Sequence, residues 1–317
     1  MPPVPDPAAP PDVTLVVPAF NEAGRLAAGY ARLAPVLAEW DAVVEVIVVD
    51  DGSSDRTGVV AAEVFAEVTP HLVVRHDHNR GKGAAVRTGI AVARGARLIV
   101  ADADMAIDPH HFPAMAAALD RADLVPGSRA LDGHVRYRHP TRTVAGRVFN
   151  RVVRHYSGVA LGDTQCGAKA YRLGAARAIA LLARIDGFAF DAEFLYLARE
   201  LGLSIEPFPV TWTDVAGSSV NLGSGTRAMI VDLRTIGRSR VENPVVALVP
   251  RTDVVAVREA ARTHRVVGAV LARGASEDLL VLSRDDAVAG AGLAATLGGR
   301  LRVAGLDELR GREFVAV

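Results

Sequence analysis

The chain has 317 residues, of which 50% are hydrophobic, and its 36 Lys and Arg residues balance its 36 Asp and Glu residues. This composition excludes a wholly disordered chain, a collagen-like fibre and a small disulfide scaffold. The zero net charge argues against a general nucleic-acid-binding protein, which needs a basic surface.

The single cysteine, Cys166, allows no intramolecular disulfide, so a reducing compartment is the simple interpretation. Residues 1–12 are rich in Pro and Ala, and we expect them to form a disordered tail without the features of a signal peptide. No apolar stretch approaches the roughly 20 residues that a membrane-spanning helix needs. The sequence therefore predicts a cytoplasmic protein whose contact with a membrane is peripheral.

From residue 13 onward, short β-rich runs alternate with helical patterns. The predicted strands cover residues 13–17, 44–49, 72–75 and 98–101. Helical patterns cover residues 24–39 and 83–94, and a third helix follows Asp55. This alternation predicts an α/β domain with a mostly parallel, Rossmann-like sheet and helices on both faces. Such sheets bind ligands at the carboxyl ends of their strands, so polar motifs at those ends are informative.

The rest of the chain divides into two parts. Residues 123–240 are less regular, with strands predicted at 124–125, 167–171 and 205–211 and helices at 143–156, 175–183 and 190–201. After residue 240 the predicted order βαββαβ indicates a small α+β, ferredoxin-like module. We therefore expect one domain over residues 13–240 and an accessory module over residues 241–317. The module has no evident catalytic cluster, so an interaction or regulatory role and a stabilising extension are equally supported.

Two polar motifs follow the first two predicted strands. The first motif, Pro18 to Glu22, lacks the GxGxxG pattern of a dinucleotide-binding turn, and a helix cap explains it best when it is taken alone. The second contains the adjacent carboxylates Asp50 and Asp51. Their mutual repulsion costs free energy, which favours a functional role for the pair. These carboxylates suit hydrogen bonding to a base and to ribose hydroxyls, whereas Ser53 to Asp55 fit a turn and a helix cap.

Two further motifs follow the third and fourth strands. Lys82, in Asn79-Arg80-Gly81-Lys82-Gly83, lies near a helix N-terminus that favours an anion, although an exposed basic loop is the simpler interpretation. Asp102 and Asp104 flank Ala103 and form an oxygen-ligand pair suited to Mg²⁺, with two solvated turn acids as an equally supported alternative.

The four motifs together resemble those of the inverting family 2 glycosyltransferases of the GT-A fold. The resemblance spans residues 13–239 and is strongest to the polyprenyl-phosphate sugar synthases, which include dolichyl-phosphate β-glucosyltransferases and mannose synthases. It rests on the stretches VVPAFNE, VDDGSSDRT, HNRGKGAAVRTG, DADM, GSR, DTQCGAKAY and FDAE. The stretch DTQCGAK and the later Trp212-Thr213 and Gly217-Ser218 are most similar to the glucosyltransferase branch.

The resemblance implies a role for each matching residue. It implies that the nucleotide-sugar donor is bound by Pro18, Ala19, Asn21, Glu22, Asp50, Asp51, Lys82, Asp102, Ala103, Asp104 and Gln165. Asp102 and Asp104 would hold Mg²⁺ or Mn²⁺. Ala106 stands where the mannose synthases have a further polar ligand, which leaves the third metal ligand unassigned. The catalytic residues near the sugar would be Asp104, Lys169, Asp191 and Glu193.

The acceptor side is predicted from residues 136–156. The helical pattern at 143–156 has one apolar face and a second face with Arg147, Arg151 and Arg154. Taken alone, this favours a core-facing helix with a solvated basic face, but the resemblance places the lipid-acceptor region here and favours a membrane-surface helix. Arg129 and Arg142 would bind an acceptor phosphate. A phosphate is already anionic at neutral pH, so Asp191 or Glu193 is needed as a base only for a hydroxyl acceptor.

The sequence thus predicts a metal-dependent, inverting transfer of a hexose, glucose from UDP-glucose, to polyprenyl or dolichyl phosphate at the cytoplasmic face of the membrane. The same donor chemistry on a soluble acceptor and a non-catalytic nucleotide-sugar sensor remain as alternatives, and the choice between UDP and GDP is open. The accessory module is a candidate for protein binding or oligomerisation. We expect His76, His78, His110 and His111 to be surface residues, and the glycine-rich segment 217–225 to be a lid over the donor.

Overall fold

The computed structural model describes residues 10–66, 68, 70–132, 135–136, 161–213, 231–233, 236, 245–250, 254–263, 270–273, 277–282, 287–299, 301–303 and 308–316. Most of the predicted tail, Arg142, the basic helix at 143–156 and the segment 217–225 lie outside these residues. Among the described helices, none combines the length and the apolar character needed to cross a membrane.

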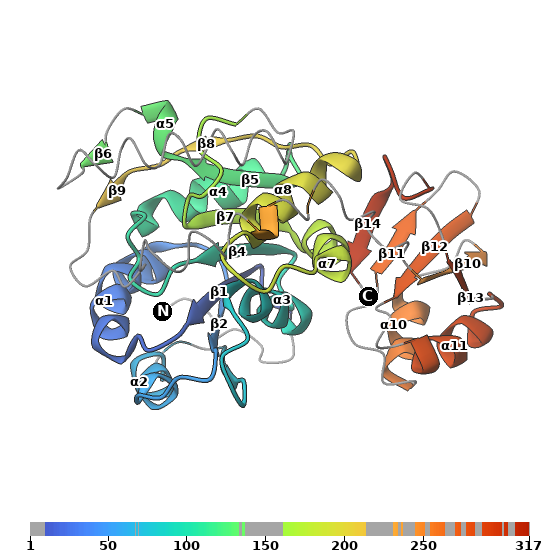
Figure 1. Cartoon of the computed structure of the whole chain (residues 1–317), viewed down its shortest axis with the longest axis horizontal. Coiled ribbons are helices and arrows are strands. Elements are labelled where there is room, and N and C mark those ends of the chain that lie inside the picture. Colours follow the sequence, from blue (N-terminus) through green and yellow to red (C-terminus); the bar gives the residue numbers. More distant parts are fainter. Residues whose placement is uncertain are drawn as a thin grey trace.

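A seven-stranded sheet in the order β3-β2-β1-β4-β7-β5-β8 forms the centre of the larger unit (Figure 1). The first four strands are parallel, and β7 is antiparallel to both of its neighbours. The strands are β1 (Val13–Ala19), β2 (Val44–Asp50), β3 (His71–Arg75), β4 (Arg97–Ala101), β5 (Leu124–Ser128), β7 (Ala168–Arg172) and β8 (Phe208–Pro209). The predicted mostly parallel sheet is therefore confirmed.

Helices cover both faces of this sheet, as the unbroken apolar strands require. One face packs against α1 (Ala23–Glu39), α2 (Thr57–Val64) and α4 (Phe112–Ala118). The other packs against α3 (Lys82–Val92), α7 (Leu173–Leu182) and α8 (Phe190–Glu200). Successive residues of one strand point to opposite faces of the sheet. Val16 therefore packs in the core beside α3, α7 and α8, whereas its neighbours Leu15 and Val17 pack in the core beside α1, α2 and α4.

Short elements extend the sheet on the side of β5. The 3₁₀ turn η1 (Pro109–His111) precedes α4, and α5 (Arg129–Asp132) follows β5. The strands β6 (Val135–Arg136) and β9 (Trp212–Thr213) form a separate parallel pair. The strand predicted at 205–211 reduces to β8 and an isolated bridge at Ile205, because the apolar run is interrupted by prolines that cannot donate to a ladder.

The C-terminal residues form a second sheet with two described helices. Its five antiparallel strands are ordered β13-β10-β12-β11-β14. The elements are β10 (Val245–Pro250), α10 (Val254–Thr263), β11 (Val270–Arg273), β12 (Glu277–Leu282), α11 (Ala287–Thr296), β13 (Leu301–Val303) and β14 (Glu313–Ala316). The structure thus confirms a small antiparallel α+β unit, and the edge strand β14 was not predicted.

This second unit packs closely against the first through β14 and α7 (Figure 1). A Cβ on Gly174 would lie 1.9 Å from the backbone oxygen of Phe314, so only glycine allows the two elements to approach so closely. The backbone N–H of Gly311 donates to the carbonyl of Leu201 at 2.9 Å. One hydrophobic core includes residues of both units, such as Ile179 and Ala316.

Candidate functional site

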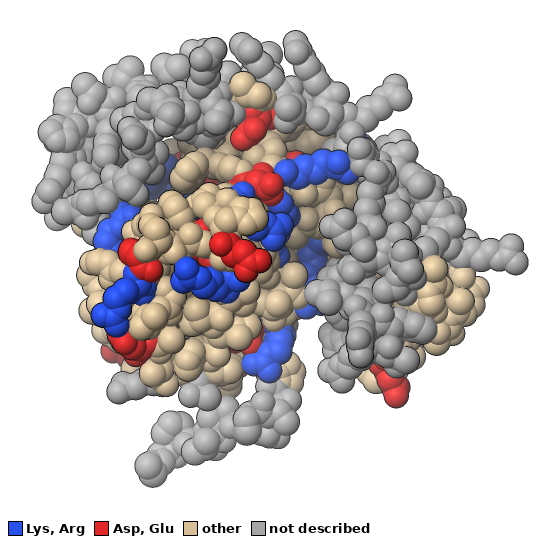
Figure 2. All heavy atoms as spheres, turned by 60° about the horizontal axis from the view of Figure 1, so that its bottom comes forward, with Lys and Arg blue, Asp and Glu red and all other residues tan. Residues whose placement is uncertain are grey.

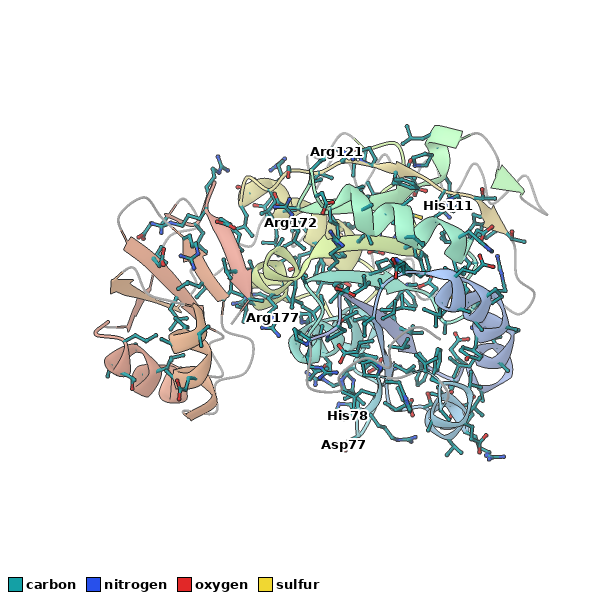
Figure 3. All side chains as sticks on the ribbon, turned by 180° about the vertical axis from the view of Figure 1, so that it is seen from behind. Asp77, His78, His111, Arg121, Arg172 and Arg177 are labelled. Atoms are coloured by element: carbon teal, nitrogen blue, oxygen red, sulfur yellow. The ribbon has the colours of Figure 1, made fainter. Side chains whose placement is uncertain are left out.

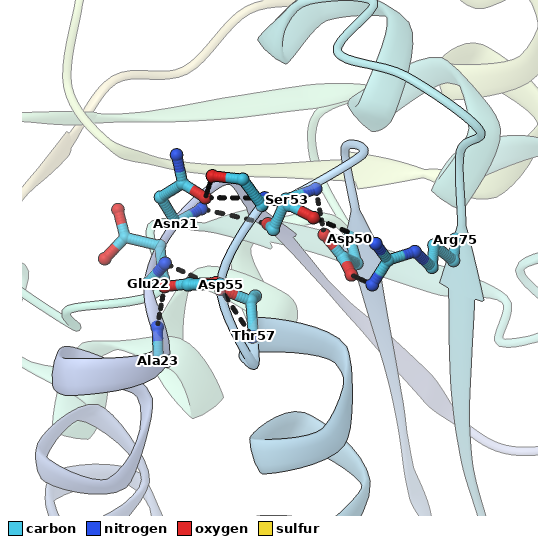
Figure 4. A network of polar contacts seen from close by, with 9 residues as sticks. Asn21, Glu22, Ala23, Asp50, Ser53, Asp55, Thr57 and Arg75 are labelled. Carbon is cyan, nitrogen blue, oxygen red and sulfur yellow. Dashed lines mark hydrogen bonds and ion pairs between the residues drawn. The ribbon is translucent and has the colours of Figure 1, made fainter.

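The loops after β1 and β2 are bound to each other by side chains (Figure 4). The N–H of Asn21 donates to Ser53 Oγ at 2.9 Å, and the N–H of Ser54 donates to Asn21 Oδ1 at 2.9 Å. The N–H of Glu22 donates to Thr57 Oγ1 at 2.8 Å. Asn21 has a positive φ of 54°, a conformation that Asn tolerates better than most residues. These contacts fix the shape of the edge to which the donor motifs contribute.

Pro18 and Ala19 are the last two residues of β1 and are buried in it, opposite Val49 and Asp50 of β2. Asp50 is fully buried as well. Its carboxylate accepts the N–H of Ser53 at 2.9 Å and the Arg75 guanidinium at 2.8 Å (Figure 4). Asp50 therefore stabilises the turn after β2, and its side chain presents no accessible surface to a ligand.

Asp51 fastens the loop before α3 to the end of β2. Its carboxylate accepts the N–H groups of Arg80 and Gly81 at 2.9 and 2.8 Å and lies 2.7 Å from His76 Nδ1. The other ring nitrogen of His76 lies 2.9 Å from Thr88 Oγ1 on α3. His76 is buried, so the prediction of a surface histidine is wrong at this position, because the imidazole is needed to pair a buried carboxylate.

The other histidines of that set lie in two separate places, His78 in one and the adjacent His110 and His111 in the other. Asp77 and His78 lie on the exposed connection between β3 and α3, whereas His111 lies at the start of α4 (Figure 3). His111 Nε2 accepts the N–H of Thr211 at 3.0 Å, and His110 is largely exposed. Within the described part of the chain, no group of three or more metal-ligating side chains occurs.

Lys82 is the first residue of α3 and reaches the end of β4. Its Nζ lies 2.6 Å from Asp102 Oδ1. Burial opposes the charge of Lys82, but Asp102 and Asp191 outweigh this effect and raise the pKa of the ammonium. The predicted donor lysine and the predicted metal ligand are therefore in direct contact.

Asp102 and Asp104 lie at the carboxyl end of β4, with Ala103 buried between them. Burial and the charge of Asp102 raise the pKa of Asp104, although Arg25 Nη1 lies 3.7 Å from Asp104 Oδ2. Burial likewise raises the pKa of Glu22 against the opposing effect of Arg25, with which Glu22 forms an ion pair. Burial and like charge thus disfavour the ionised form of these carboxylates, and a bound cation would relieve both effects.

These residues fit a divalent cation that takes the rest of its ligands from substrate and water. Two carboxylates, without a third side-chain ligand in the described residues, match the way in which Mg²⁺ is held beside phosphates. Ala106 contributes only its backbone, and its N–H donates to Asp104 Oδ1 at 3.1 Å.

The antiparallel strand β7 brings the predicted residue Lys169 to this edge. Lys169 Nζ lies 2.7 Å from Asp191 Oδ1 and donates to the carbonyl of Cys166 at 2.7 Å. Gly167 faces Asp102 so closely that a Cβ would lie 2.2 Å from Asp102 Oδ2. Gln165, two residues earlier, donates its N–H to Asp163 Oδ1 at 3.3 Å.

Glu193 follows Asp191 by two residues, about half a turn of α8, and has a different set of contacts. Its carboxylate accepts the N–H of Ile185 at 2.8 Å and that of Arg184 at 3.0 Å. Burial raises its pKa, although these hydrogen bonds oppose the shift. Glu193 therefore stabilises the segment before α8, and of the two predicted acids only Asp191 contacts Lys169.

Arg129, predicted to bind an acceptor phosphate, forms a two-pronged ion pair with Asp163. Its Nε and Nη2 lie 2.6 and 2.9 Å from the two carboxylate oxygens. Burial opposes ionisation of Asp163, but Arg129 outweighs it and lowers the pKa of the carboxyl. A phosphate would have to share or replace this partner. Arg142 lies outside the described residues.

The sequence did not reveal the ion-pair partners of three predicted site residues. These partners are Arg25 for Glu22, Arg75 for Asp50 and Asp163 for Arg129. The spacing of Glu22 and Arg25, three residues apart at a helix start, is the one local signal that pointed to any of them. On the described part of the face shown in Figure 2, acidic and basic side chains are interspersed, and neither sign forms a patch of its own.

Comparison with known proteins finds a matching family model and similar proteins that are all described as glycosyltransferases. Residues 14–179 match the model of the family described as Glycosyl transferase family 2. The dolichyl-phosphate beta-glucosyltransferase of Drosophila melanogaster is 33% identical over 225 residues, which cover 66% of this chain and 69% of that protein. The protein of the same name from Homo sapiens is 30% identical over 224 residues, with the same coverage of 66% and 69%.

Solved structures resemble the chain in fold. Glucosyl-3-phosphoglycerate synthase from Mycobacterium tuberculosis, in complex with Mn²⁺, UDP and glucosyl-3-phosphoglycerate, matches with a TM-score of 0.54 at 19% identity, covering 75% of this chain and 84% of that one. Its complex with Mg²⁺ and UDP gives the same TM-score at the same identity. At this identity the likeness establishes the architecture alone.

Proposed function

The chain belongs to glycosyltransferase family 2, and from this premise we propose that it transfers glucose from UDP-glucose to a polyprenyl or dolichyl phosphate. The observation that carries the proposal is the contact between Lys82 and Asp102, which joins two donor motifs at the carboxyl edge of one sheet. The relatives named dolichyl-phosphate beta-glucosyltransferases support the choice of sugar and acceptor.

On the donor side, the base and ribose would lie against the joined loops after β1 and β2. Asn21 is exposed there, whereas Asp50 and Asp51 hold the loops in shape. Asp102 and Asp104 would hold Mg²⁺ or Mn²⁺, which supplies Lewis-acid stabilisation of the diphosphate leaving group. Lys82 would add a positive charge to the same leaving group, where negative charge develops in the transition state.

On the acceptor side, a phosphate oxygen would attack the anomeric carbon as the bond to the nucleoside diphosphate breaks. The attacking phosphate is already anionic, so no proton has to be removed by a strong base. Lys169 holds Asp191 in place, and Asp191 would be needed as a base only if the acceptor were a hydroxyl. Arg129 and Arg142 remain the proposed phosphate ligands, and the basic segment 143–156 the proposed contact with the cytoplasmic face of a membrane.

For the C-terminal unit, we propose a division near residue 240 and a ferredoxin-like arrangement. The order of its first four strands, β13-β10-β12-β11, supports this arrangement. Its close packing on α7 supports the role of a stabilising extension.

The experiment is a donor-by-acceptor assay on the purified chain with Mg²⁺. UDP-glucose and GDP-mannose are each offered with and without polyprenyl phosphate in detergent, and released nucleotide is measured. We expect release from UDP-glucose only with the lipid phosphate, and none in EDTA. Release without lipid would instead indicate hydrolysis or a soluble acceptor, and tight binding without release would indicate a sensor.

A further inference from the structure

Lys82 already occupies an oxygen that a divalent cation would need. Its Nζ lies 2.6 Å from Asp102 Oδ1, and both side chains are partly exposed, at 23% and 37%. An ammonium and a divalent cation repel each other strongly at such a distance, even where water screens them. A cation therefore cannot ligate this oxygen while Lys82 keeps its place.

The backbone at Lys82 is fixed on both sides. Asp51 accepts the N–H groups of Arg80 and Gly81, and the N–H of Gly83 donates to the carbonyl of Asp186 at 2.7 Å. A Cβ on Gly81 would lie 2.3 Å from the backbone oxygen of Asp186. Any rearrangement at this point must therefore come from the side chain of Lys82.

Asp102 has little room on the side of β7. Gly167 packs against its carboxylate, so that a Cβ there would lie 2.2 Å from Asp102 Oδ2. The flexible four-carbon stem of Lys82 is the part that can move when a cation arrives. Two further carboxylates, Asp191 and Asp104, also attract its ammonium.

We propose that Lys82 couples the binding of the divalent cation to the binding of the nucleotide, an inference that rests on the proposed function. Without nucleotide, Lys82 occupies Asp102 and opposes the cation. When a nucleoside diphosphate binds, its phosphate oxygens accept hydrogen bonds from the Lys82 ammonium. Asp102 can then bind the cation. The nucleotide thereby raises the affinity for the cation, and by linkage the cation raises the affinity for the nucleotide by the same factor.

The test is calorimetric titration of the full chain with MnCl₂ alone and with UDP in EDTA. Lys82→Met keeps the length of the side chain and removes its charge. We expect this variant to bind Mn²⁺ alone about tenfold more tightly than the wild type, and UDP alone about tenfold more weakly, within the usual range of coupling between sites. Lys82→Arg keeps the charge and should keep the weak affinity for Mn²⁺.

The matched control is Arg80→Met, which removes one positive charge from an exposed side chain two positions away. Both of its affinities should stay within about twofold of the wild type, because the charge of an exposed side chain is screened by water and salt. This control separates a contact with Asp102 from a general change in net charge.

Opposite changes in the two affinities are the signature of the coupling. A Lys82→Met variant that binds Mn²⁺ no more tightly than the wild type would overturn the coupling and leave the proposed function intact, provided that the wild type binds Mn²⁺ and UDP together. A wild type that binds neither would overturn both. If Lys82→Met does not fold, the wild-type affinity for Mn²⁺ with and without saturating UDP decides, and equal affinities contradict the proposal.

Discussion

Three carboxylates near the proposed active site already have cationic partners within the chain. Asp102 is paired with Lys82, Asp191 with Lys169 and Asp163 with Arg129. The sequence motifs located most of these residues but not their pairing, because the partners lie 20, 22 and 34 positions apart and no local spacing encodes such contacts. The same limit explains why the sequence did not show that Asp50, a predicted donor-binding residue, accepts hydrogen bonds from Arg75 and from the N–H of Ser53.

Asp104→Asn tests the proposed cation site. It preserves the size of the side chain and removes one of two charged ligands, so we expect at least about a hundredfold loss of glucosyl transfer, by comparison with the effects of altering metal sites. The measurement is the transfer rate at saturating Mg²⁺. Asp77→Asn, on the exposed loop before α3 (Figure 3), serves as the control and should retain full activity; an equally active Asp104→Asn variant would exclude the cation site.

Glu193→Gln tests the structural assignment of Glu193 through pH. Burial raises the pKa of Glu193 above its ordinary value of 4.5, so the folded chain binds this proton more tightly than the unfolded chain. The protonated side chain therefore makes its full contribution to the free energy of unfolding below about pH 4.5, and this contribution is lost as the pH rises through the pKa of the folded state. The loss amounts to about 1.4 kcal/mol for each unit by which folding raises the pKa. The glutamine variant does not titrate.

Urea unfolding of both proteins between about pH 4 and pH 7 measures this effect. The stability advantage of the wild type over Glu193→Gln should shrink as the pH rises. An advantage that grows with pH would show that the hydrogen bonds from Ile185 and Arg184 outweigh burial.

At the level of helices and strands, local pattern was sufficient for the first half of the sheet. Apolar runs bounded by turns gave β1, β2, β3 and β4 to within a few residues, and their parallel order followed from the helices between them. The strand β7 was predicted but its direction was not. It lies antiparallel between β4 and β5, with Ala168 opposite Ala101, so its amino end meets the carboxyl end of β4. This long-range pairing is what places Lys169 at the site.

Gly81→Ala tests the close packing that holds the start of α3. Gly81 has a φ of 103°, and an added Cβ would lie 2.3 Å from the backbone oxygen of Asp186. Strain and overlap together should reduce the free energy of unfolding by about 1–3 kcal/mol. Gly24→Ala, where a Cβ has nothing within 4 Å, should be neutral or stabilising because it lies in a helix. Equal stabilities of the two variants, measured by urea unfolding, would contradict this packing.

Over the whole molecule, the C-terminal unit is more closely joined to the rest than the change in composition near residue 240 suggested. Residues of both units share one hydrophobic core, and β14 lies against α7. The helix α7 directly follows β7, the strand that carries Lys169, so the second sheet packs against the next element in the chain. The sequence did not reveal this contact, because neither β14 nor α7 has a sequence pattern that identifies the element it packs against.

This shared core predicts that the two units unfold together. Calorimetry of the full chain should give one cooperative transition, since opening either unit exposes apolar surface of the other. A separate transition at lower temperature that disappears on deletion of residues 241–317 would show that the two units are energetically independent.

Glucose transfer to a lipid phosphate is tested most directly by isolating the product. The chain is incubated with UDP-glucose, Mg²⁺ and dolichyl phosphate in detergent, and the lipid fraction is analysed by mass spectrometry and by the anomeric coupling in its NMR spectrum. An inverting transfer predicts a β-linked glucosyl phosphate on the lipid, formed with one UDP released for each glucose transferred. An unmodified lipid in the presence of active nucleotide release, or an α-linked product, would contradict the mechanism proposed here.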